Sequence, residues 1–319
     1  MNVRRHHISG LALAAAGLLG MGTLSACSTA GAAAGDTDKF DVVASFYPME
    51  FLAERIGGAH VSVTTLTEPG QEPHDLEISA RQTAQLQESD AVLYLAGLQP
   101  AVDDAVGQSS AGTKIDAAKL THLEDLGVED GHDHGGSAEE GSEEGAHLDP
   151  HVWLDPVRYA EIAEGVGKAF EKADPEHAAD YRKNTAALVE ELGGLDTAFA
   201  QGLKDTKTKT FFTNHTAFGY LAERYGLTQE AISGLDPESE PSPARIRELQ
   251  EEAEADGVTT VFYETLVSDK TAKTLASDAG LRTDVLDPLE GITDRSRGDD
   301  YLQVMRANLK ALQTALGTK

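Results

Sequence analysis

The sequence predicts an α/β fold of two lobes, each a parallel sheet flanked by helices, joined by one long rigid helix. Strand and helix signals alternate along residues 40–173 and again along 205–319. A strand–helix–strand order places parallel strands side by side, with helices on the faces of the sheet. Between the two stretches, residues 174–204 form one predicted helix of roughly 45 Å, long enough to cross a whole domain.

In the first lobe, three short runs rich in β-branched and apolar residues predict strands, at 41–47, 61–66 and 91–96. The first strand is followed by a helical stretch that ends at the Gly57-Gly58 pair. Ser79 and Gln82 form a capping box, which predicts the start of another helix that runs to about residue 88.

Two consecutive helices follow in the middle of the chain. Asp155-Pro156 offers a capping side chain and a proline at the first helical position, so a helix is expected from there to about Lys172. Asp174-Pro175 is a second Asp-Pro pair of this kind and begins the long helix, which is expected to continue to about Lys204. Its apolar face repeats at helical spacing.

The alternation of strands and helices then resumes in the second lobe. The predicted strands are 210–213, 230–233, 258–263 and 283–286. A helix begins at Ser242-Pro243 and ends at Gly257, and a last helix covers about 299–316. No internal sequence repeat relates the two lobes, so their likeness is one of pattern.

The N-terminus has the features of a targeting segment. Arg4 and Arg5 precede an apolar run that is too short for a good membrane span. The run ends in Leu24-Ser25-Ala26-Cys27, which resembles a bacterial lipobox. We therefore expect residues 1–27 to be a lipoprotein signal peptide and 28–39 a flexible tether. Acylated Cys27 would then hold the protein at the extracytoplasmic face of the bacterial cell membrane.

Composition and charge exclude some classes of partner. Cys27 is the only cysteine, so no intrachain disulfide can form, and the core must hold the fold together. The formal net charge of −28 argues against nucleic acid as a partner. The same charge attracts cations to the protein without defining a site.

Residues 129–147 contain seven acids, five glycines and three histidines, His132, His134 and His147. No large apolar residue interrupts them, so we expect a mobile loop. Short His-rich tracts commonly bind metal, which makes the three histidines an accessory metal loop. The alternative is a solvated acidic linker in which the histidines are incidental.

Open parallel sheets bind ligands beyond the carboxyl ends of their strands. Three histidines stand in such places: His74 after the strand at 61–66, His151 before the Asp155 helix, and His215 directly after the strand at 210–213. Asp287 directly follows the strand at 283–286. Each alone fits a loop or a capping residue, and spacing does not bring them together, so it is their combination that points to a metal site.

These segments resemble the metal-specific solute-binding lipoproteins of ABC importers, cluster A-I. The matching motifs are Glu72-Pro73-His74-Asp75, His151-Val152-Trp153-Leu154-Asp155-Pro156, Asn214-His215-Thr216-Ala217-Phe218-Gly219-Tyr220-Leu221, Glu240-Pro241-Ser242-Pro243 and Leu286-Asp287-Pro288-Leu289. The resemblance extends from about residue 40 to the end. It implies two lobes joined by a rigid helix, with one metal ion between them, bound by His74, His151, His215 and Asp287.

The resemblance also implies a function. The protein would be a monomer without catalytic activity that captures a metal ion and passes it to an ABC permease. Three histidines and one carboxylate suit tetrahedral Zn²⁺, and the His-rich loop is typical of the zinc-binding members. Mn²⁺ is the alternative cargo. The fourth ligand is left open between Asp287, Glu264 and water.

Two other classes of function compete with transport. A surface zinc hydrolase would keep three protein ligands and a free position for water. However, the sequence contains no His-Glu-x-x-His motif and no acid close to the histidines that is an evident general base. An adhesin or scaffold with a structural metal is the other alternative.

Overall fold

This computed structural model describes residues 39–126 and 148–318. The chain divides into two units, Met1–Asp38 and Lys39–Lys319, and all that follows concerns the second. The predicted signal peptide with Cys27, nearly all of the tether and the His-rich loop at 129–147 lie outside the described residues.

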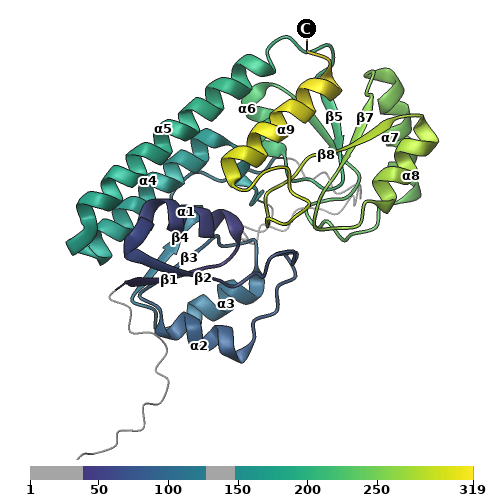
Figure 1. The fold of residues 1–319 in the computed structure, drawn as a ribbon. Helices are drawn as coiled ribbons and strands as arrows, with labels where there is room; N and C mark the ends of the chain where they lie inside the picture. Colours follow the sequence, from purple (N-terminus) through teal and green to yellow (C-terminus); the bar gives the residue numbers. More distant parts are fainter. Residues whose placement is uncertain (1–38, 127–147, 319) are drawn as a thin grey trace, which may run out of the picture. The chain divides into compact units, whose positions relative to one another are not determined.

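The first lobe is built on a parallel sheet with the strand order β2-β1-β3-β4 (Figure 1). Its strands are β1 (Phe40–Ala44), β2 (Val61–Thr65), β3 (Ala91–Tyr94) and β4 (Thr113–Asp116). Its helices are α1 (Tyr47–Gly57), α2 (Ala80–Glu88) and α3 (Pro100–Gln108). The sequence pattern predicts neither α3 nor β4. For β4 the reason is that its residues, Thr-Lys-Ile-Asp, include one large apolar side chain and show no clear alternation.

The second lobe repeats this arrangement with the strand order β6-β5-β7-β8, again parallel. Its strands are β5 (Thr210–Thr213), β6 (Thr228–Ala231), β7 (Thr260–Tyr263) and β8 (Arg282–Val285). Its helices are α6 (Gly219–Tyr225), α7 (Pro243–Ala255), α8 (Lys270–Ala279) and α9 (Tyr301–Leu316). The predicted fold class is therefore confirmed.

Helices α4 (Pro156–Ala173) and α5 (Ala178–Gly202) lie side by side, and α5 contacts both α1 of the first lobe and α9 of the second (Figure 1). Asp155 caps α4 as predicted, accepting a hydrogen bond from the backbone of Val157. The start of α5 differs from the prediction. A short 3₁₀ turn, Pro175–His177, precedes it, and Asp174 accepts from the Tyr181 hydroxyl instead of capping the backbone.

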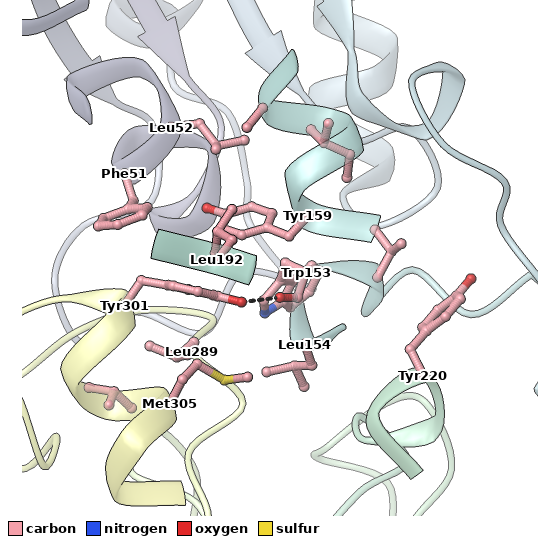
Figure 2. Close-up of a cluster of buried hydrophobic side chains, with 14 of the residues drawn as sticks. Phe51, Leu52, Trp153, Leu154, Tyr159, Leu192, Tyr220, Leu289, Tyr301 and Met305 are labelled. Atoms are coloured by element: carbon pink, nitrogen blue, oxygen red, sulfur yellow. Dashed lines mark hydrogen bonds between the residues drawn. The ribbon is translucent and has the colours of Figure 1, made fainter. Parts of the chain in front are cut away.

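One hydrophobic core includes residues of both sheets and of the helices between them. Figure 2 shows its centre, where Tyr159 of α4 and Tyr301 of α9 lie with ring centroids 4.6 Å apart. The buried side chains of Trp153, Leu289 and Met305 belong to the same cluster. Because the two lobes share this packing, the segments that meet between them are held in a defined geometry.

The predicted capping box of α2 is present, with Ser79 and Gln82 bonding each other's backbone. Ser242 caps α7 through the backbone N–H of Arg245. Among the described residues, none of the helices combines the length and the apolar character needed to cross a lipid bilayer.

Candidate metal centre

Four side chains from four separate segments meet between the two sheets: His74, His151, His215 and Glu290. Each offers one ligand atom, and these atoms all lie within 4.8 Å of one another. His74 and His215 follow β2 and β5, and Glu290 follows β8, so all three stand beyond the carboxyl ends of parallel strands. His151 comes directly before the buried 3₁₀ turn Val152–Leu154.

The geometry converges on one carboxylate oxygen. Glu290 Oε1 lies 3.1 Å from His74 Nε2, 3.2 Å from His151 Nε2 and 3.3 Å from His215 Nε2. The Nε2 atoms of His151 and His215 are 3.4 Å apart. In a tetrahedral zinc site with bonds of about 2.0–2.1 Å, neighbouring ligand atoms are about 3.3 Å apart. These four distances therefore match those between ligands of one small ion.

The site is almost closed to solvent. The side chains of His151, His215 and Glu290 are fully buried, while that of His74 is 14% exposed. Glu290 Oε2 is buried without a hydrogen-bond partner among the described residues. A buried carboxylate oxygen with no donor is costly, and a bound cation would compensate it.

Two further carboxylates orient the imidazoles from behind. Asp149 Oδ1 accepts from His151 Nδ1 at 2.8 Å, and Glu264 Oε1 accepts from His215 Nδ1 at 2.6 Å. A carboxylate on one ring nitrogen sets the tautomer that leaves the other free to bind metal. Glu264 was the competing candidate for the fourth ligand, but its bonded oxygen lies behind His215, away from the converging Nε2 atoms.

Asp287 is not a member of the group, contrary to the sequence-based expectation. Its carboxylate accepts from the backbone N–H of Leu289 at 2.9 Å and from the Thr265 hydroxyl at 3.2 Å. One oxygen is thus bonded within its own turn and the other to the segment that follows β7. Glu290, three residues later, occupies the fourth position instead.

The sequence points to Asp287 and not to Glu290 because Asp287-Pro288 directly follows the predicted strand. One signal could have revealed Glu290. Glu290 is an isolated acid in the run Leu289-Glu290-Gly291-Ile292, and it is 1% exposed. An acid among apolar residues is seldom buried unless it is paired or binds metal.

Neighbouring charges shift the pKa values of the buried ligands. Burial alone would lower the pKa of His151, but the carboxylates of Asp149 and Glu290 outweigh it and raise that pKa. Glu264 and Glu290 likewise outweigh burial at His215 and raise its pKa. Burial would raise the pKa of Glu290, yet the imidazoles hold it well below its usual range. A metal ion must therefore displace protons when it binds.

Among the predicted accessory ligands, His132, His134 and His147 lie outside the described residues. The structure thus brings together three of the predicted ligands, His74, His151 and His215, and adds Glu290 to them.

The chain is similar to known components of zinc-uptake systems. The family model for ZnuA, the periplasmic component A of zinc-uptake complexes, matches residues 42–315. The high-affinity zinc uptake system protein ZnuA of Bacillus subtilis (strain 168) is 35% identical over 317 residues, which cover 98% of both chains.

Two further matches come from Streptococcus pneumoniae. The zinc-binding lipoprotein AdcA of strain TIGR4 is 38% identical over 91% of this chain, but the chain spans only 58% of that protein's length. The crystal structure of the Zn(II)-bound ZnuA-like domain of AdcA is 36% identical. It matches with a TM-score of 0.71, covering 87% of this chain and 99% of that one.

Proposed function

Because this chain belongs to the ZnuA family of zinc-uptake components, we propose that it captures Zn²⁺ outside the cell and delivers it to an ABC permease. The supporting observation is that three histidine nitrogens and one carboxylate oxygen, drawn from both lobes, all lie within 4.8 Å of one another. The protein acts by binding and release, without catalysis.

The ligand set favours Zn²⁺ over Mn²⁺. Imidazole nitrogen suits zinc, whereas manganese prefers sites rich in oxygen ligands. Here nitrogen contributes three ligand atoms and Glu290 contributes one. Mn²⁺ should therefore bind the same site more weakly.

The arrangement argues against the hydrolase alternative. A catalytic zinc keeps one coordination position open for water, whereas here a fourth protein ligand occupies that position. Among the other carboxylates near the histidines, Asp149 and Glu264 are bonded to imidazole nitrogens, and Glu72 accepts from the backbone N–H groups of His74 and Asp75.

The partners follow from the proposed transport role. A permease of a zinc importer would receive the ion, and the protein would act as a monomer. Acylated Cys27 would anchor it to the outer face of the cell membrane. The lipobox-like sequence at residues 24–27 supports the anchor, and the related AdcA is a lipoprotein by name.

Calorimetric titration with Zn²⁺ and Mn²⁺ tests the site. His215→Ala should weaken zinc binding by more than about a hundredfold, since loss of even an outer partner of a metal ligand costs about 10–100-fold. His122→Ala is the matched control, because His122 is exposed and does not belong to the group. Unchanged zinc affinity in His215→Ala would show that the site is wrong.

We also propose that residues 129–147 collect zinc at low affinity near the main site. Support comes from the three histidines in the sequence and from the described flanks, where the backbone N–H of Asp149 donates to the carbonyl of Glu124 at 2.9 Å. Replacing 129–147 with a short Gly-Ser linker should remove weak zinc binding and preserve tight binding. Loss of the tight site would contradict this role.

A further inference from the structure

Trp153 contacts one of the four ligands and is hydrogen-bonded to the loop that contains another. It is the only tryptophan in the chain and is fully buried. Its ring lies against the imidazole of His151, with centroids 5.2 Å apart, and meets Phe46 edge-on from the other side. The indole is therefore in direct contact with one metal ligand.

The same indole reaches the loop that contains another ligand. Trp153 Nε1 donates a hydrogen bond of 2.7 Å to the backbone carbonyl of Pro288, two residues before Glu290. Tyr301 in turn donates its hydroxyl to the backbone carbonyl of Trp153 at 2.6 Å, as Figure 2 shows. The two bonds tie the segment after His151 to the second lobe.

The turn from Asp287 to Glu290 contains a strained backbone conformation. Leu289 has a φ of 60°, in the left-handed region that a leucine rarely adopts. The Asp287 carboxylate accepts from the backbone N–H of Leu289, and the side chain of Asn308 bonds both backbone groups of Asp287. A backbone in such a conformation persists only while its surroundings hold it.

We propose that Trp153 is a positioning residue of the zinc site. Its indole N–H holds the Pro288 carbonyl and so sets the place of Glu290, while its ring sets the orientation of His151. This inference rests on the proposed zinc-binding function. Without the N–H, the Pro288 carbonyl is left buried and unpaired, and the strained turn relaxes away from the site.

Trp153→Phe keeps an aromatic ring and removes the N–H. We expect it to weaken zinc binding about tenfold, which corresponds to about 1.4 kcal/mol. Calorimetry on the purified full chain measures this change. The matched control is Tyr159→Phe, which removes another buried aromatic donor to a proline carbonyl, the 2.6 Å bond from Tyr159 to Pro48, and leaves the bond from Trp153 to Pro288 in place. Its zinc affinity should stay within about twofold of the wild type.

A double-mutant cycle separates positioning from general destabilisation. If Trp153 acts through Glu290, Trp153→Phe should change zinc affinity by less than about twofold in a Glu290→Gln background. Equal weakening in both backgrounds, or no weakening in either, would overturn the proposal. Should Trp153→Phe fail to fold, a tryptophan analogue with sulfur in place of the indole N–H makes the same test at nearly unchanged shape.

A spectrum gives a second readout that packing alone would not change. Co²⁺ in place of Zn²⁺ has visible d–d bands that report coordination geometry. Trp153→Phe should change these bands in the same direction as Glu290→Gln, and Tyr159→Phe should leave them as in the wild type. If the wild type binds no zinc, the proposed function fails. If it binds and Trp153→Phe matches it in affinity and spectrum, only this inference fails.

Discussion

Asp287 and Glu290 belong to one turn but serve different purposes. Asp287 uses its carboxylate to accept hydrogen bonds from Leu289 and Thr265, which shapes the turn. Burial raises the pKa of the Asp287 carboxyl group. Glu290 points its Oε1 at three imidazoles. The two carboxylates therefore have different partners although they are only three residues apart in the sequence.

Paired substitutions separate these two roles. Glu290→Gln removes the negative ligand and should weaken zinc binding by more than about a hundredfold, beyond the range for outer partners of metal ligands. Asp287→Asn keeps an oxygen that can accept from the Leu289 N–H, so its zinc affinity should fall by less than about tenfold. Calorimetry compares the two. If the order is reversed, Asp287 is the ligand.

At the scale of single elements, helices α4 and α5 pack closely because glycine replaces a side chain at their contact. A Cβ on Gly167 of α4 would lie 2.3 Å from Thr185 Oγ1 and 3.1 Å from Thr185 Cβ on α5. Gly193 in α5 is exposed and would meet nothing within 4 Å. Glycine is thus required for close packing at position 167, whereas at position 193 it only reduces the stability of the helix.

Two alanine substitutions should therefore have opposite effects on the free energy of unfolding. Gly193→Ala should raise it by about 0.5–1 kcal/mol, because alanine loses less backbone entropy in a helix. Gly167→Ala should lower it by about 1–3 kcal/mol through overpacking. Urea denaturation followed by circular dichroism measures both. A stabilising Gly167→Ala would show that α4 and α5 can separate at little cost.

Near the start of α5, the carboxylate of Asp174 accepts hydrogen bonds from the side chains of His177 and Tyr181. Burial would raise the pKa of Asp174, but hydrogen bonds from the Tyr181 hydroxyl and from His177 outweigh it, so the pKa is lowered. A carboxyl group with a lowered pKa in the folded state stabilises the fold above its unfolded pKa. This contribution is lost as the pH falls through the folded value.

Asp174→Asn should accordingly lower the stability at neutral pH, and the difference from the wild type should shrink as the pH falls into the acid range. Urea midpoints measured between neutral and acid pH reveal this trend. Thr197→Ala, on the exposed surface of α5, changes no titrating group and should show a difference that does not vary with pH. A constant difference for Asp174→Asn would mean that its ionisation is not linked to folding.

At the scale of the whole molecule, described for residues 39–126 and 148–318, the two sheets share one core. That core contains Val42 and Leu93 of the first sheet, Phe211 and Phe262 of the second, and Leu192 of α5. The zinc site adds a second connection between the lobes, since its ligands come from both. The lobes should therefore unfold together.

Calorimetric unfolding should show one transition, which zinc shifts upward as a whole. At a free zinc concentration about 100 times Kd, binding adds about 2.7 kcal/mol to the free energy of unfolding. Glu290→Gln at the same zinc concentration should show a much smaller shift. Two separate transitions, only one of them sensitive to zinc, would contradict a shared core.

Local signals were sufficient for much of this structure. The alternation of strands and helices predicted both sheets, and Ser79, Asp155 and Ser242 marked helix starts that the structure contains. The β4 strand was not predicted, because Thr-Lys-Ile-Asp lacks a strand-like pattern of apolar residues. It is a strand in the structure because it pairs with β3. Signals of this kind depend on neighbours in the chain, which is why a sequence reveals them.

By itself, the sequence determined the two-lobed α/β class and pointed to three histidines, two after strands and one at a helix start, as ligands. Only the tertiary structure decided that Glu290 completes their group, that Asp287 shapes the turn, and that Trp153 joins two ligand segments. The physical reason is distance along the chain. Glu290 lies 139 residues from His151, and which side chains meet depends on how strained turns and shared packing orient segments that are remote in sequence.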